Sequence, residues 1–280
     1  MTEPEYHGRL APSPSGYLHL GHAQTFWTAY ARASSSGGRL SLRVEDIDTS
    51  RCRQEYLEAM IEDMEWFGLR WTNLTLVMQS HRKVLYIEAW RDLLRGSRVY
   101  PSPHSRKDVS EAITAPHEGD AEIIFPVSLR PLEMPCSADG DEPGKVNWRF
   151  KVPDDRLVTF VDENFGPQSF TAGVDFGDFV IWGGASNMPS YELAVVVDDA
   201  DMGISEVVRG GDLVLSTARQ ILLYEALDLK MPSFYHCPLV RDENGKRMAK
   251  RNSSTTLRGL REAGWTPEKI RLSLFQDEQK

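Results

Sequence analysis

Two kinds of hydrophobic pattern alternate along the first hundred residues, and this alternation limits the possible fold more than any other feature of the sequence. Residues 6–10 and 39–44 have the period of a strand, whereas residues 20–32 and 54–67 carry apolar side chains at helical spacing. A further helix with Ser80 as its cap is expected next. This order is typical of a parallel sheet covered by helices. The sequence therefore predicts an α/β fold.

The pattern changes in the middle of the chain. Prolines become frequent, and short strand-like pieces such as NWRFKV and RLVTFVD replace the earlier alternation. The alternation then resumes, and a helix with Asp212 as its N-cap is expected after two glycines. We therefore expect an α/β domain in two halves, residues 1–99 and 190–240, split by a small α+β insertion over residues 100–189. Residues 241–280 are expected to form a loop and short helices.

Composition is that of an ordinary globular protein, with 41% hydrophobic and 26% charged residues. No apolar run approaches the roughly 20 residues that span a bilayer, and the N-terminal residues have no signal-peptide pattern. Three widely spaced cysteines fit a reducing compartment, so we expect a cytoplasmic protein without membrane contact. The net charge of −9 argues against general nucleic-acid binding, although residues 241–280 are locally basic.

A loop rich in proline, serine and glycine leads into the helix expected at residue 20, and it carries His19 and His22. A metal site would need further ligands, and none are clustered nearby in the sequence. Ordinary capping or packing is a second interpretation. The third is anion binding, because a helix N-terminus offers backbone N–H groups and the positive end of a dipole. We favour phosphate over metal.

A second polar loop, NGKRMAKRNSS, lies near the end of the chain and contains Lys246, Arg247, Lys250 and Arg251. Its cations could close over a triphosphate and neutralise a leaving pyrophosphate. The alternative is a solvated basic loop, which is the commoner role of such a run. Together with the histidine pair, the loop suggests nucleotidyl transfer.

Several longer motifs resemble one family. HLGH at residues 19–22 and RMAKR at residues 247–251 resemble the two signatures of class I aminoacyl-tRNA synthetases. RLAPSPSGYLHLGHA, LRVEDIDTSR and VVVDDADMGISEVVRGGDLVLSTARQILLYEAL resemble the glutamyl and glutaminyl branch of that family. The resemblance covers nearly the whole chain. It implies a Rossmann-like (HUP-type) parallel sheet split by an inserted acceptor-binding-like subdomain.

Within this branch, the length of the chain resembles the glutamyl-queuosine tRNA(Asp) synthetase paralogues. Roughly thirty residues follow Arg251, enough for two short helices, the second capped by Thr266 with Pro267 at its first position. The resemblance implies that there is no anticodon-binding domain. It also implies that L-glutamate is activated by ATP with Mg²⁺ without tRNA, and then esterified to the queuosine base at the wobble position of tRNA(Asp).

The resemblance assigns roles to particular residues. Arg9 and Arg209 match the carboxylate-binding arginines, and Glu45 matches the acid that holds the α-ammonium group. Ala11, Ser13 and Tyr191 complete the expected glutamate site, and His19, Gly21, His22, Arg247, Met248, Lys250 and Arg251 the expected ATP site, with His19, His22 and Lys250 as catalytic residues. Without the resemblance, Glu45 could be an acid at a strand end and Tyr191 a half-buried aromatic side chain.

Two departures from the family pattern stand out. Many relatives hold a structural zinc in the insertion, but the four matching positions here are Ser102, His104, Phe125 and Leu129. With one possible ligand of four, we expect no structural zinc. Ala249 replaces the serine of the second signature, which removes one hydroxyl group and keeps the cations.

Three other functions remain as alternatives. The chain could be a truncated glutamyl-tRNA synthetase that charges tRNA(Glu), or a catalytically silent paralogue that binds tRNA. A pantothenate-synthetase-like nucleotidyltransferase shares the histidine motif but explains none of the glutamate-site residues. We expect a monomer.

Overall fold

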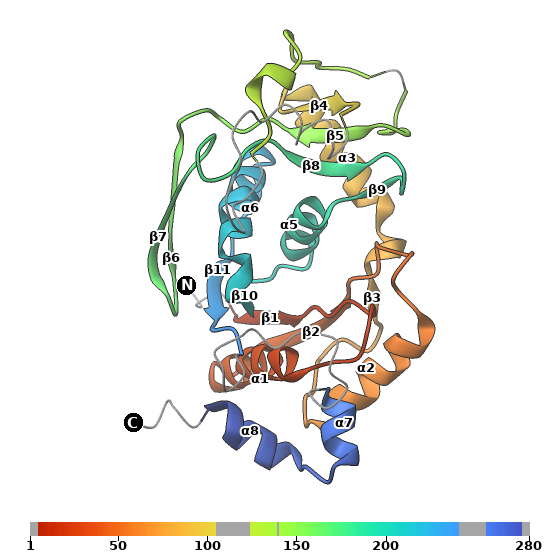
Figure 1. Cartoon of the computed structure of the whole chain (residues 1–280), viewed down its shortest axis with the longest axis vertical. Helices are drawn as coiled ribbons and strands as arrows, with labels where there is room; N and C mark the ends of the chain where they lie inside the picture. Colours follow the sequence, from red (N-terminus) through yellow and green to blue (C-terminus); the bar gives the residue numbers. More distant parts are fainter. Residues whose placement is uncertain (1–4, 105–123, 139, 241–255, 276–280) are drawn as a thin grey trace.

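Two small sheets form the centre of the molecule (Figure 1). The computed structural model describes residues 5–104, 124–138, 140–240 and 256–275. The first sheet is parallel, in the order β1 (His7–Leu10), β2 (Arg39–Val44), β3 (Val77–Met78). The second has the order β10 (Glu206–Gly210), β11 (Ser233–Cys237), β6 (Leu157–Asp162), β7 (Gly166–Thr171), and only β7 runs antiparallel to its neighbour.

The two sheets meet where β1 lies beside β10. The backbone N–H of Ser205 donates to the carbonyl of His7 at 2.8 Å, next to the start of β10. Further along, the guanidinium of Arg9 donates to the carbonyl of Val208, also at 2.8 Å. In a continuous sheet a backbone N–H would donate to this carbonyl, whereas here a side chain does so. The two sheets act as one interrupted parallel sheet.

Helices cover both faces of this interrupted sheet and create two hydrophobic cores. One face is covered by α1 (Leu20–Ser35), α2 (Gln54–Trp66), α7 (Leu257–Glu262) and α8 (Pro267–Phe275); the other is covered by α3 (Lys83–Arg95), α5 (Tyr191–Asp201) and α6 (Val214–Ala226). Because successive strand residues point to opposite faces, Val207 belongs to one core and Val208 to the other. Among the described residues, no helix is long and apolar enough to cross a membrane.

A third, antiparallel sheet lies at the far end of α3 (top of Figure 1). Its order is β4 (Val99–Ser102), β5 (Asn147–Phe150), β8 (Phe179–Gly183), β9 (Met188–Pro189), and single turns of 3-10 helix occur at Gln79–His81, Val127–Leu129 and Gly211–Leu213. Trp148 meets Trp90 of α3 edge to face, with ring centroids 4.9 Å apart. The hairpin β6–β7 comes from the same stretch of chain but pairs with β11 through Asp162 and Phe234. The inserted stretch therefore contacts the central sheet through this hairpin as well.

The expected α/β fold is confirmed, and so are the helices around residues 20–32 and 54–67 and the two short helices near the C-terminus. Two expected caps are wrong. The helix after Ser80 begins only at Lys83, because the backbone N–H and hydroxyl of Ser80 both donate to Asp46. Asp212 lies within a 3-10 turn, and α6 begins after it at Val214.

One buried carboxylate holds the third sheet to its surroundings. Asp178 accepts hydrogen bonds from the Tyr100 hydroxyl at 2.6 Å and from the Val152 N–H at 2.9 Å. Arg130 donates to both of its carboxylate oxygens at 2.7 Å. Arg130 also donates to Asp154, whose side chain is exposed.

We predict that Asp178→Asn lowers the free energy of unfolding by about 3 kcal/mol, because Arg130 then keeps a largely buried charge without its main partner. Asp154→Asn changes the same arginine's exposed partner and should cost less than about 1 kcal/mol. Urea unfolding of both variants and the unchanged protein measures this difference. Equal losses in the two variants would contradict the assigned role of Asp178.

Candidate active site

A cavity of about 340 Å³ opens at the carboxyl ends of β1 and β10, where the two sheets meet. Chain order reverses here, with β2 on one side of β1 and the later strand β10 on the other. Open α/β sheets bind ligands at such switch points. Nine of the expected site residues line the cavity: Arg9, Ala11, Ser13, His19, Gly21, His22, Glu45, Tyr191 and Arg209.

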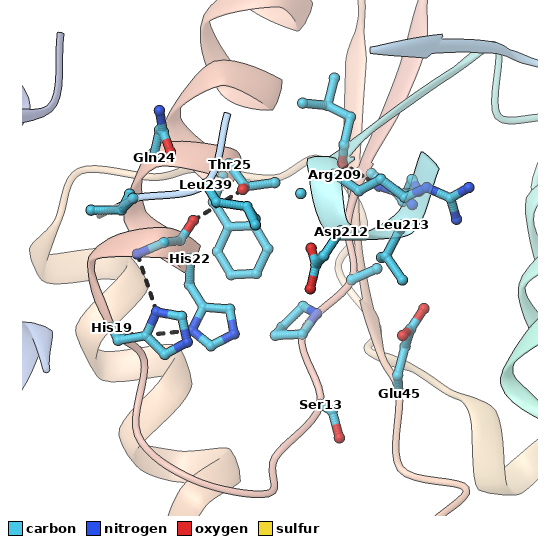
Figure 2. Close-up of a pocket in the computed structure, with 18 of the residues that line it drawn as sticks. Ser13, His19, His22, Gln24, Thr25, Glu45, Arg209, Asp212, Leu213 and Leu239 are labelled. Carbon is cyan, nitrogen blue, oxygen red and sulfur yellow. Dashed lines mark hydrogen bonds between the residues drawn. The ribbon is translucent and has the colours of Figure 1, made fainter. Parts of the chain in front are cut away.

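The two histidines cap helix α1 with their own rings (Figure 2). His19 is the N-cap residue, and its Nδ1 accepts the backbone N–H of Gly21 at 3.1 Å. The Nδ1 of His22 accepts the backbone N–H of His19 at 3.2 Å, which completes a reciprocal capping box. The capping interpretation is therefore confirmed for this pair, and anion binding stays a prediction.

These caps fix which ring nitrogen carries the proton. A neutral imidazole has one N–H donor and one acceptor. Since Nδ1 is the acceptor in both His19 and His22, each neutral ring carries its proton on Nε2. Glycine at residue 21 leaves room for the His19 ring, because a Cβ there would lie 3.0 Å from Cε1 of His19. The start of α1 thus combines two imidazole N–H donors with the positive end of a helix dipole.

Two buried arginines, Arg9 and Arg209, supply positive charge to the cavity, and Figure 2 shows Arg209 across the cavity from the histidine pair. Arg9 donates to the Val208 carbonyl, and its Nε lies 3.6 Å from a carboxylate oxygen of Asp199. Arg209 donates from Nη1 to the Tyr191 hydroxyl at 3.2 Å and from Nη2 to the Thr217 hydroxyl at 2.7 Å. Such fixed guanidinium groups suit a carboxylate.

A chain of buried charges connects Arg9 with Glu45. Asp199 accepts from Arg43 at 2.6 Å, and the other end of the Arg43 guanidinium donates to Glu45 at 3.2 Å. Arg43 is fully buried, so both of these carboxylates compensate for its charge. Burial raises the pKa of Glu45, while Arg43 and Arg9 oppose the rise. Glu45 is the acidic group of the cavity that the charge chain holds in place.

The side chains of Tyr191 and Ser13 bring hydroxyl groups to the cavity. Burial raises the pKa of Tyr191, so its phenol keeps its proton and can donate while it accepts from Arg209. Ser13 is exposed, and its Oγ lies 3.8 Å from the sulfur of Cys52. Fixed cations, the acids Glu45 and Asp212, neutral donors and a capped helix N-terminus thus surround one cavity. This set suits a ligand with carboxylates, an ammonium group and phosphates.

Comparison with known proteins identifies the family of the chain. Residues 5–276 match the family described as tRNA synthetases class I (E and Q), catalytic domain. The chain belongs to this family. It is 44% identical to the glutamyl-Q tRNA(Asp) synthetase of Symbiobacterium thermophilum over 94% of this chain and 83% of that protein. It is 38% identical to the glutamate–tRNA ligase of Aquifex aeolicus over 94% of this chain, but spans only 55% of that protein.

Solved structures agree with the fold of this class I synthetase chain. The crystal structure of a glutamate tRNA ligase from Elizabethkingia meningosepticum, in complex with its amino acid, superimposes with a TM-score of 0.77 at 25% identity. The match covers 97% of this chain and 60% of the ligase chain. The interrupted parallel sheet with its insertion is therefore the synthetase catalytic fold.

The four residues expected from the second synthetase signature, Arg247, Met248, Lys250 and Arg251, lie outside the described residues. The residues on either side of that stretch are placed. Pro238, Leu239 and Val240 line the cavity after β11. On the other side, Thr256 forms a β-bridge with His19, and the N–H of Leu257 donates to the Leu18 carbonyl at 2.8 Å. Val240 therefore lies at the cavity wall, and Thr256 lies beside the histidine pair.

The positions that match zinc ligands in relatives have a different environment here. Ser102 is buried and accepts from Arg149, and Phe125 is buried in a small apolar cluster with Tyr100, Leu129 and Met134. The Arg149 guanidinium lies over the Phe125 ring at 4.1 Å. The His104 ring centroid is 6.3 Å from that of Phe125. Across the described parts of the chain, no three His, Cys, Asp or Glu residues gather as a metal site requires.

Sequence reasoning missed the residues that support the site. Arg43 of β2, Asp199 of α5 and His236 of β11 contact Glu45, Arg9 and Arg209 respectively. Asp212 and Thr25 also line the cavity, and Thr25 donates to the Gly21 carbonyl. The acidic pair in VVVDDADM gave one signal, because two carboxylates inside an apolar helix need buried partners.

Proposed function

We propose that this synthetase activates L-glutamate with ATP, without tRNA, and transfers the glutamate to the queuosine base of tRNA(Asp). The observation that carries the first step is the arrangement of Arg9, Arg209 and Glu45 around one cavity. Glutamate has two carboxylates and one ammonium group; Arg9 and Arg209 are cations for the carboxylates, and Glu45 is an acid for the ammonium group. A ligand with a neutral side chain, such as glutamine, would leave part of this charge unmatched.

In the proposed reaction, an oxygen of the glutamate α-carboxylate attacks the α-phosphorus of ATP. A new bond forms between this oxygen and the α-phosphorus. The bond between the α-phosphorus and the oxygen that bridges it to the β-phosphorus breaks, and pyrophosphate leaves with that electron pair. We assign His19 and His22 to the phosphate oxygens, since their Nε2–H groups donate where negative charge develops. ATP binds as its Mg²⁺ complex, so that the ion is part of the substrate.

The signature loop supplies the remaining cations in this proposal. Lys250, with Arg247 and Arg251, neutralises the β- and γ-phosphates, and Met248 and Gly21 belong to the ATP site. The support is that Val240, which precedes this stretch in the sequence, lines the cavity, and Thr256, which follows it, pairs with His19. Glutamate is held by Arg9, Ala11, Ser13, Glu45, Tyr191 and Arg209.

The acceptor is proposed from relatives. The relative named glutamyl-Q tRNA(Asp) synthetase is 44% identical and is matched over 83% of its length, compared with 38% and 55% for the Aquifex aeolicus glutamate–tRNA ligase. In the second step, a hydroxyl of the queuosine base attacks the glutamyl carbonyl and AMP leaves. We also propose that the protein acts as a monomer in the cytoplasm. The inserted domain is proposed to begin at residue 100 and to end at residue 189. We further propose that the insertion needs no structural zinc.

ATP–pyrophosphate exchange with glutamate, glutamine and aspartate, without tRNA, tests the first step. We expect exchange with glutamate alone. Transfer of labelled glutamate to tRNA(Asp) with and without queuosine, and to tRNA(Glu), tests the second. Labelling of tRNA(Glu) would show a truncated glutamyl-tRNA synthetase, and absence of any exchange would show a silent paralogue.

We predict that His22→Ala and Lys250→Ala each slow glutamate-dependent exchange by on the order of 100-fold, because each removes a donor from the developing phosphate charge. His81→Ala and Lys269→Ala replace exposed residues outside the cavity and serve as matched controls with unchanged rates. Exchange at the normal rate in both His22→Ala and Lys250→Ala would contradict the roles assigned to these two residues.

Glu45 should give glutamate binding a characteristic pH dependence. Its carboxylate must be ionised to hold an ammonium group, and burial raises its pKa. The KM for glutamate should therefore rise as the pH falls, beginning above the range in which an exposed carboxyl titrates. Glu45→Gln should raise KM roughly 10- to 100-fold at neutral pH and flatten this profile. Glu58→Gln, on the exposed side of α2, should keep the profile of the unchanged protein.

A further inference from the structure

Arg209 is oriented by two groups from behind the cavity. Its Nη2 donates to the Thr217 hydroxyl, and its Nε donates to Nε2 of His236 at 3.1 Å. His236 lies on β11, its side chain is fully buried, and it is not among the residues that line the cavity. It therefore acts on the cavity through Arg209.

The direction of this hydrogen bond determines the tautomer of His236. A guanidinium can only donate, so Nε2 of His236 must offer a lone pair and the ring proton must be on Nδ1. That Nδ1–H donates to Asp162 Oδ2 at 2.6 Å. The opposite tautomer would place an N–H against the N–H of Arg209. The carboxylate of Asp162 thus selects the only tautomer that accepts from Arg209.

Asp162 is itself firmly held. Its other oxygen, Oδ1, accepts the backbone N–H groups of Asn164 at 3.1 Å, Phe165 at 2.8 Å and His236 at 3.3 Å. These bonds, together with His236, lower the pKa of Asp162 against the effect of its burial, so it is a carboxylate at neutral pH. Asn164 adds a bond from its side chain to the His236 carbonyl. The turn between β6 and β7 is therefore fixed to the end of β11.

The charges around the ring keep it neutral. Burial lowers the pKa of His236 to about 4, and the cations Arg209 and Arg9 act in the same direction while Asp162 opposes them. Asp162, His236 and Arg209 form a hydrogen-bonded series, here called the relay. At neutral pH it consists of one carboxylate, one neutral imidazole and one guanidinium. Their order, Asp162 to His236 to Arg209, runs from the β6–β7 hairpin to the cavity wall.

We propose that Asp162 and His236 are positioning residues that orient the Arg209 guanidinium for a substrate carboxylate. This inference rests on the glutamate-binding role proposed for Arg209. The relay makes a hairpin of the inserted stretch part of the amino-acid site, although neither Asp162 nor His236 lines the cavity.

Two substitutions of His236 separate orientation from simple packing. In His236→Gln the amide oxygen stands near the place of Nε2 and can still accept from Arg209, whereas the bond to Asp162 is lost. In His236→Asn the amide nitrogen stands near the place of Nδ1 and can donate to Asp162, whereas Arg209 loses its acceptor. We expect KM for glutamate in ATP–pyrophosphate exchange to rise roughly tenfold or more in the Asn variant, and at most about threefold in the Gln variant.

Asp162→Asn provides a second measurement that does not alter the ring. The three backbone N–H groups keep the oxygen of the substituted amide on their side, so its NH₂ group faces Nδ1 and favours the wrong tautomer. We expect KM for glutamate to rise about as much as in His236→Asn, with a much smaller change in kcat and in KM for ATP. Asn164→Ala removes a neighbouring bond between hairpin and strand and should leave KM for glutamate within about twofold.

Urea unfolding of each variant shows whether it is folded under assay conditions. Equal KM values for the Asn and Gln variants of His236, or an unchanged KM in Asp162→Asn, would overturn the positioning role while glutamate activation by the unchanged protein stood. Absence of glutamate-dependent exchange in the unchanged protein would instead overturn the proposed function, and the positioning role with it.

Discussion

The requirement that every buried charge be compensated shapes the centre of this molecule. The cavity needs cations and an acid at the junction of two sheets, where burial makes an uncompensated charge cost several kcal/mol. Asp199 contacts both Arg9 and Arg43, and Arg43 in turn donates to Glu45. Arg43 also lies 3.7 Å from Asp198, which accepts from Arg82 and the Tyr86 hydroxyl. The compensation extends from the cavity to α3 through α5.

The helix that faces these charges also uses the same side chains for two purposes. His19 and His22 satisfy two backbone N–H groups that every helix start leaves without an intrahelical partner. In doing so they fix their own tautomers, because the N–H group of each neutral ring is then on Nε2. A serine or aspartate at residue 19 could cap the helix equally well, but it would not provide a ring N–H. The cap and the proposed phosphate donors therefore belong to the same two rings.

The sequence predicts well whatever depends on neighbouring residues. Periodicity located β2 and α2 almost to the residue, and Thr266 accepts the N–H of Lys269 as an N-cap should. The sequence patterns failed where a residue distant in the sequence determines the local hydrogen bonds. Ser80 is a good cap by composition, yet Asp46 takes its hydrogen bonds. Resemblance to a family brought Arg9, Glu45 and Arg209 together, but not His236, whose partners come from β6 and β10 and have no local pattern.

The bond between Leu257 and Leu18 and the bridge between Thr256 and His19 have a consequence for the stretch from residue 241 to residue 255. Val240 lines the cavity, so both attachment points of this stretch are fixed by the scaffold. The entropy of bringing its ends together is part of the cost of folding, and ATP binding need not supply it again.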